Sequence, residues 1–152
     1  MRKILIAMIL GMGSLVANAI DPFVELAPII TGDNAASFNI QGGITHKVHP
    51  YIRIGAGAGF TQDWNFEYGP MIPVFVRAQA EKSFGGITPY LSFDLGYEIN
   101  TESSKYGAIL LNPMLGVQIG RFYGGVGYLG HCYTEGDGIT GSNFVLRLGV
   151  TF

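Results

Sequence analysis

Hydrophobic and polar residues alternate along most of the chain after residue 20, and this period of two predicts β-strands. Turn residues divide the pattern into eight segments, at 22–31, 36–46, 50–61, 71–82, 88–99, 106–119, 121–133 and 142–152. The last segment is among the most regular, and its apolar face consists of Phe144, Leu146, Leu148, Val150 and Phe152. No segment beyond residue 19 shows a helical period, so the sequence predicts a single all-β domain.

The polar faces of these segments indicate which side meets water. A soluble β-sandwich also alternates, but its outer faces are normally rich in Lys and Glu. Here Lys47, Lys82 and Lys105 fall in connections or at segment ends, and the polar faces consist mainly of Gly, Ser, Asn and Gln. Such faces suit the narrow, filled lumen that eight strands enclose. We therefore predict an eight-stranded antiparallel up-and-down transmembrane β-barrel with its apolar face toward lipid.

Aromatic residues fall mostly toward segment ends, as expected where an apolar band meets two layers of headgroups. One predicted belt consists of Phe23, Tyr51, Phe84, Tyr90, Phe122, Tyr123 and Phe152. The other consists of Phe38, Phe60, Trp64, Phe66, Tyr68, Tyr97, Tyr106, Tyr133 and Phe144. The remaining aromatic residues, Phe75, Phe93 and Tyr128, lie near segment centres.

The first nineteen residues have a different character from the rest. Arg2 and Lys3 precede a short apolar run, and Ala17-Asn18-Ala19 supplies small residues at a cleavage position. This order is typical of a secretory signal peptide over residues 1–19, which leaves a barrel domain over 20–152. That domain carries seven Lys/Arg and eleven Asp/Glu, and this balance excludes the basic surface of a nucleic-acid-binding protein. A single cysteine, Cys132, excludes an internal disulfide framework.

Charged residues on the predicted inner face can be matched between neighbouring strands at similar depth. The matches are Arg53 with Glu81, Arg77 with Asp94, and Arg147 with Glu25 across the closure between the first and last strands. Such pairing is needed because an unpaired charge in a low-dielectric interior is strongly unfavourable. We predict that the pairs fix the register and fill the lumen, with an ion path or gate as the alternative.

Proline and glycine mark irregular places in the pattern. Pro28 and Pro113 fall within segments and each removes a backbone donor, so a bulge or a locally open pairing is predicted at both. The run Gly55-Ala56-Gly57-Ala58-Gly59 resembles a phosphate-binding loop, but no helix follows it. Small residues that permit tight curvature of a barrel wall are the better interpretation.

The predicted signal peptide, the eight strands and the terminal phenylalanine together resemble the small eight-stranded outer-membrane β-barrel superfamily of bacteria. The most specific element is Phe144-x-Leu146-x-Leu148-x-Val150-x-Phe152, which in that family is the signal read by the barrel-assembly machinery. The resemblance implies the outer membrane of a Gram-negative bacterium, with both termini in the periplasm. It also implies periplasmic chaperones during biogenesis, contact with outer-membrane lipid and lipopolysaccharide, and a monomer. The loops that would face outward carry Asp33, Asp63, Glu67, Glu102, Glu135 and Asp137 against Lys105 alone.

Because this scaffold hosts several functions, three are considered. The first is an integral outer-membrane barrel with a filled polar lumen and a structural or surface-interaction role, without catalysis. The second is a narrow porin-like conduit for ions or small solutes. The third is a lipid A-modifying enzyme, because Gly130-His131-Cys132-Tyr133 resembles the His-x-Ser site of lipid A deacylase barrels. Tyr133 replaces that serine and Cys132 points away from His131, so His131 is interpreted as a rim residue, and no catalytic residue, cofactor or metal site is predicted.

Overall fold

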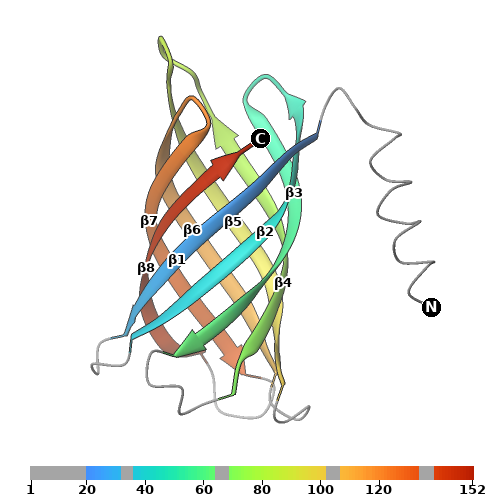
Figure 1. The fold of residues 1–152 in the computed structure, drawn as a ribbon, viewed down its shortest axis with the longest axis vertical. Helices are drawn as coiled ribbons and strands as arrows, with labels where there is room; N and C mark the ends of the chain where they lie inside the picture. Colours follow the sequence, from blue (N-terminus) through green and yellow to red (C-terminus); the bar gives the residue numbers. More distant parts are fainter. Residues whose placement is uncertain (1–19, 32–35, 64–68, 102–106, 134–138) are drawn as a thin grey trace, which may run out of the picture.

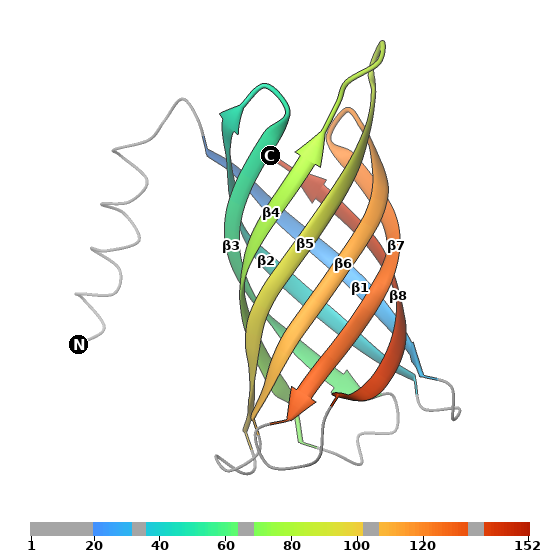
Figure 2. The same cartoon turned by 180° about the vertical axis from the view of Figure 1, so that it is seen from behind.

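Eight antiparallel strands account for nearly all of the residues that the structure, a computed structural model, describes: 20–31, 36–63, 69–101, 107–133 and 139–152. The strands are β1 (Ile20–Thr31), β2 (Ala36–His49), β3 (Ile52–Asp63), β4 (Met71–Glu81), β5 (Ile87–Asn100), β6 (Gly107–Ile119), β7 (Phe122–Tyr133) and β8 (Ile139–Thr151). Each strand pairs with its neighbour in the chain and β1 also pairs with β8, so the sheet closes into a barrel (Figures 1 and 2). The predicted fold is confirmed, whereas the predicted signal peptide, residues 1–19, lies outside the described residues.

The strand limits differ from the predicted segments mainly in the second and last strands. β2 continues to His49 instead of ending at residue 46, and it does so through a bulge between Lys47 and His49. The turn to β3 therefore falls at Pro50 and Tyr51. β8 begins at Ile139 rather than at residue 142. A bulge adds a residue to one strand only, so a simple two-residue period does not locate such an end.

The two ends of the barrel are built differently. At the hairpin end, short turns join β2 to β3, β4 to β5 and β6 to β7, and β1 begins and β8 finishes at this same end (Figure 1). Two of these turns contain Gly85, Gly86 and Gly120, whose φ values of 58°, 101° and 59° are adopted by glycine without steric strain. At the opposite loop end, the connections contain residues 32–35, 64–68, 102–106 and 134–138.

Apolar side chains cover the outside of the barrel. In β4, for example, Val74 and Val76 are exposed while Phe75 between them is buried. The same alternation leaves Leu115 of β6 61% exposed and Leu148 of β8 63% exposed. A monomeric protein in water rarely presents such a large contiguous apolar surface. The barrel is therefore inside-out relative to a soluble protein, as the sequence pattern predicts.

Prolines open the ladder locally without shifting it. The pairing of β1 with β8 skips Ala27 and Pro28, and that of β6 with β7 skips Asn112 and Pro113, while the register on either side is unchanged. Both prolines remain opposite a partner on their other side, in β2 and β5. The predicted locally open pairing is thus confirmed at both positions. It arises because proline has no N–H to donate to the neighbouring strand.

Three aromatic residues that the sequence assigns to the belt at the hairpin end do not lie on the outer surface. Phe23 and Tyr90 are buried in the lumen, and Tyr123 points its hydroxyl group inward. The residues opposite Phe23, Tyr90 and Tyr123 in the ladder are Gly43, Gly116 and Gly149. A Cβ atom at any of these glycines would collide with the facing ring. The glycines therefore do more than permit curvature, because they leave the room in which the rings lie.

The other predicted belt residues divide between exposed positions and positions outside the described part of the chain. Exposed rings at the hairpin end are Tyr51, Phe84, Phe122 and Phe152, and those toward the loop end are Phe60, Tyr97 and Phe144. Phe38 is half-buried. Trp64, Phe66, Tyr68, Tyr106 and the side chain of Tyr133 are outside the described residues. Exposed aromatic rings thus occur toward both edges of the apolar surface.

Candidate functional site

The centre of the lumen holds four charged side chains that come from four strands. Glu25 lies on β1, Arg77 on β4, Asp94 on β5 and Arg147 on β8, each on the polar side of its strand. Their exposed fractions are 2%, 4%, 1% and 1%, respectively. This group, called the central ionic cluster below, is therefore shielded from solvent.

Each carboxylate of the central ionic cluster contacts both arginines. Arg77 Nε and Nη2 donate to Asp94 at 2.7 and 2.8 Å, and its Nη1 and Nη2 donate to Glu25 at 3.0 and 2.7 Å. Arg147 Nη2 donates to Asp94 at 2.6 Å, and its Nε lies 3.2 Å from Glu25 Oε1. Two positive and two negative charges thus form a neutral cycle of ion pairs, in which Arg77 makes two hydrogen bonds to each carboxylate and Arg147 makes one to Asp94.

All three ion pairs predicted from the sequence are present. They are Arg77–Asp94 and Arg147–Glu25 at the distances above, and Arg53–Glu81 with Nε 3.4 Å from Oε2. The contacts of Arg77 with Glu25 and of Arg147 with Asp94 were not predicted. They cross the lumen between strands that are not neighbours in the sheet, and matching by strand adjacency does not find such contacts.

Neutral groups complete the coordination of the cluster. Tyr123 Oη donates to Glu25 Oε2 at 2.6 Å, and the side-chain amide of Gln41 also donates to Glu25. The guanidinium carbon of Arg77 lies 4.7 Å from the ring centroid of Phe23 and 5.2 Å from that of Phe75, a cation–π arrangement. Glu25 of β1 is consequently bound to groups from β2, β4, β7 and β8.

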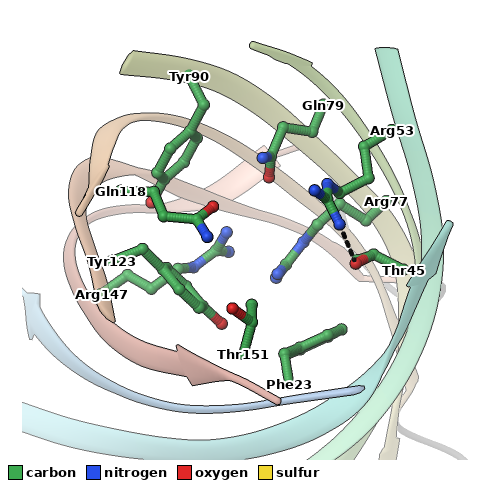
Figure 3. A pocket seen from close by; sticks show the side chains of 10 residues that line it. All are labelled: Phe23, Thr45, Arg53, Arg77, Gln79, Tyr90, Gln118, Tyr123, Arg147 and Thr151. Atoms are coloured by element: carbon green, nitrogen blue, oxygen red, sulfur yellow. Dashed lines mark hydrogen bonds between the residues drawn. The ribbon is translucent and has the colours of Figure 1, made fainter. Parts of the chain in front are cut away.

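A second group of charges lies nearer the hairpin end. Arg53 contacts both Asp21 and Glu81, and Lys47 Nζ is 3.2 Å from Glu81 Oε1. Arg53 Nη1 also donates to Thr45 Oγ1 at 3.3 Å, the contact drawn as a dashed line in Figure 3. Lys47 and Asp21 are 48% and 44% exposed while Glu81 is buried, so the pairs that include Lys47 or Asp21 stabilise the barrel less than those of the central ionic cluster.

Side chains converge from all around the wall in the space between these two groups (Figure 3). Its lining consists of Phe23, Thr45, Arg53, Arg77, Gln79, Tyr90, Gln118, Tyr123, Arg147 and Thr151. The free volume is only about 20 Å³, enough for a single water molecule. Polar groups surround this space, but it is far too small for a solute.

The lumen toward the loop end contains a further buried acid, Glu98. Glu98 Oε2 of β5 lies 2.8 Å from His131 Nε2 of β7, and Thr61 Oγ1 of β3 lies 3.5 Å from Glu98 Oε1. His131 is buried and lies two residues before the loop end of β7, so its imidazole is in the lumen close to that end. Its strand carries a bulge between Gly130 and Cys132, and the imidazole faces the interior.

An apolar cluster fills the lumen beside β1, β6, β7 and β8. Its members are Ala27, Ile29, Leu110, Met114, Leu129 and Val145. They are as deeply buried as the core of a soluble protein. Both ionic and apolar packing therefore fill the lumen.

Within the described residues, no three His, Cys, Asp or Glu side chains are grouped closely enough to hold a metal ion. No helix in the described part of the chain is long and apolar enough to cross a membrane. The predicted C-terminal signal lies with Phe144, Leu146 and Leu148 exposed on the outer face of β8, while Phe152 follows that strand and is also exposed.

Comparison of the fold with solved structures gives clear matches. The N-terminal β-barrel domain of Pseudomonas aeruginosa OprF has a TM-score of 0.57 at 16% identity, covering 87% of this chain and 97% of that one. Neisserial surface protein A has a TM-score of 0.57 at 10% identity, covering 88% and 96%. A de novo designed transmembrane β-barrel has a TM-score of 0.51 at 15% identity, covering 87% and 95%.

The sequence itself has no such matches, since no family model and no curated protein matches it. At these low identities the structural comparisons establish the fold, which is that of the small eight-stranded membrane barrels. A designed protein stands among the matches, so the shared architecture follows from barrel geometry and does not require a shared role. The role must therefore be argued from the side chains inside and outside this barrel.

Proposed function

We propose that the protein is an integral barrel of the bacterial outer membrane, with a plugged lumen, a structural or surface-interaction role, and no catalysis. The observation that carries this proposal is the central ionic cluster, sealed inside a wall whose outer surface is apolar. A lipid bilayer favours this arrangement, in which the charges are paired inside the barrel and hydrocarbon side chains cover its outside. The likeness to a domain of OprF, to Neisserial surface protein A and to a designed transmembrane barrel supports this location.

The proposal includes the partners that biogenesis in that membrane requires. The exposed face of β8 with Phe152 serves as the signal for the barrel-assembly machinery, after delivery by periplasmic chaperones. The mature barrel is a monomer that contacts phospholipid and lipopolysaccharide. An export signal over residues 1–19 belongs to the same proposal.

The experiment that tests the location uses full-length protein expressed in a Gram-negative host. The protein should fractionate with the outer membrane and migrate faster in gels when unheated, because a closed barrel resists unfolding by detergent at room temperature. Proteolysis of intact membranes should cut only connections between strands. A protein that remains in the soluble fraction without detergent would contradict the proposal.

The plugged lumen is tested by conductance in a planar bilayer. Because Arg77 and Arg147 cross the lumen and the free volume beside them holds about one water, reconstituted protein should give no stable conductance steps. Reproducible steps would show the narrow conduit instead.

The absence of catalysis is tested separately, on lipid A from cells that express the protein. This lipid A should keep all its acyl chains. A loss of acyl chains that His131→Ala abolishes would show an enzyme.

A further inference from the structure

The three turns of the hairpin end share a composition that the barrel architecture does not demand. Each contains or adjoins one cationic residue and one exposed aromatic residue: Lys47 with Tyr51, Lys82 with Phe84, and Arg121 with Phe122. The exposed ring of Phe152 lies at the same end, where β8 finishes. No Asp or Glu occurs in residues 47–52, 82–87 or 119–122. These turns therefore carry cationic and aromatic residues, while the acids of the same end, Asp21 and Glu81, are paired with Arg53.

The pairing of these cations divides them into two kinds. Lys47 Nζ reaches down to Glu81, a buried acid at the hairpin end of the lumen. Lys82 instead lies with its Nζ 5.2 Å from the ring centroid of Phe84, whose exposed fraction is 57%. Among the described residues, neither Lys82 nor Arg121 makes an ion pair with a carboxylate side chain. These two cations are thus presented outward, at the level of the exposed rings.

Aromatic rings next to basic side chains prefer the headgroup region of a membrane. Aromatic rings settle at the level of the headgroups, and a long basic side chain beside them extends its charge to the phosphate layer. A juxtamembrane Lys or Arg then gains free energy from anionic lipid. The connections at the loop end have the opposite sign, because residues 64–68, 102–106 and 134–138 contain four carboxylate residues and only Lys105 as a cation. Attraction to anionic lipid is therefore confined to one end of the barrel.

We propose that the hairpin end is a binding surface for the headgroups of anionic glycerophospholipids in the leaflet that it faces. Lys82 and Arg121 contact the phosphates, while Phe84 and Phe122 lie among the glycerol groups. This inference rests on the membrane location proposed above. It goes further, because it assigns a lipid class to one end of the barrel and gives that end a preferred leaflet.

The test uses fluorescence quenching by brominated lipids, which reports the lipid next to a chosen tryptophan. The chain has one tryptophan, Trp64, which follows β3 in a loop-end connection and reports on that end. The double substitution Trp64→Phe and Phe84→Trp moves the reporter to the hairpin end and keeps an aromatic ring beside Lys82. Vesicles contain phosphatidylcholine and phosphatidylglycerol in varied ratio, with either lipid brominated.

From the quenching of the tryptophan introduced by Phe84→Trp, we expect the hairpin end to bind phosphatidylglycerol roughly fivefold better than phosphatidylcholine. One interfacial cation gives a ratio of this size. Lys82→Gln should bring this ratio toward one, as should molar salt, which shortens the Debye length to about 3 Å. The matched control Lys105→Gln removes a cation at the loop end and should leave the ratio unchanged. The native reporter Trp64 should show no preference for phosphatidylglycerol.

Two failures of the experiment are distinguishable. If brominated phosphatidylcholine quenches the hairpin reporter and the unheated protein migrates as a barrel, but neither lipid is preferred, the inference about the hairpin end is overturned and the membrane location stands. An equal preference at both reporters also overturns it. If no lipid quenches either reporter, the protein is not inserted and the proposed function fails instead.

Discussion

Replacing Glu25 with glutamine should destabilise the barrel more than replacing Asp21, the other carboxylate on β1, with asparagine. The carboxylate of Glu25 contacts Arg77 and Arg147 and accepts a hydrogen bond from Tyr123. Glu25→Gln keeps the shape but leaves two guanidinium groups, each at most 4% exposed, with Asp94 as the one carboxylate between them. Breaking a buried pair in this way costs about 3–5 kcal/mol, because a charge remains without compensation.

Asp21→Asn is the matched control, since it makes the same chemical change on the same strand. The side chain of Asp21 is 44% exposed, and its partner Arg53 retains Glu81. A partly exposed pair of this kind contributes about 0–1 kcal/mol. Both variants would be folded into phospholipid vesicles and unfolded with urea, and the folded fraction would be read from gel migration without heating. Equal free energies of unfolding for the two variants would refute the reasoning.

A double substitution separates charge balance from loss of packing. Glu25→Gln together with Arg147→Gln removes one negative and one positive charge and leaves the Arg77–Asp94 pair intact at 2.7 Å. The double variant should therefore be less destabilised than the sum of the two single variants, with a coupling free energy of about 1–3 kcal/mol. Strict additivity would show that the four side chains do not act as a unit.

Four other substitutions test the outer surface, the packing of the lumen and the C-terminal signal. Val76→Arg, at an outward position near the centre of β4, should lower the free energy of unfolding in urea by roughly 2–4 kcal/mol. Ile87→Arg at the hairpin end should lower it by under about 1 kcal/mol. Equal losses would place the bilayer elsewhere. Gly149→Ala puts a methyl group into the ring of Tyr123 and should cost about 1–3 kcal/mol, with the phenol signal in near-ultraviolet circular dichroism altered. Phe152→Ala should change the free energy of unfolding by under about 0.5 kcal/mol, since the ring is exposed, yet reduce the amount of barrel assembled in cells; normal assembly would remove the signal role from this residue.

The barrel could be predicted from the sequence because apolar and polar residues alternate regularly along its strands. Alternation fixes the two faces of each strand, and Arg77 and Asp94 lie directly opposite each other on β4 and β5, so adjacency is enough to pair them. The open pairing at Pro28 follows from one missing N–H group, which is also a local property. Predictions of this kind need only the strand order and the register.

The remainder could not be predicted, because it depends on which side chains meet across the lumen. The contact between Arg77 and Glu25 joins β4 to β1, and that between His131 and Glu98 joins β7 to β5. The sequence pattern predicts belts from rings at strand ends, but the ring of Tyr90 is buried in the lumen. A signal for this does exist in the sequence, since Tyr90 faces Gly116 in the ladder, and a large residue opposite a glycine marks a ring that lies over the backbone.

The position of Glu25 on β1 has a consequence for how the cylinder is completed. The other three members of the central ionic cluster, on β4, β5 and β8, carry one positive charge in excess. Before β1 pairs with β8, this excess positive charge is not neutralised by Glu25. Pairing of the two strands brings the carboxylate of Glu25 to Arg147 and makes the interior neutral. A barrel without β1 would therefore hold one buried positive charge that lacks a carboxylate partner, which is unfavourable.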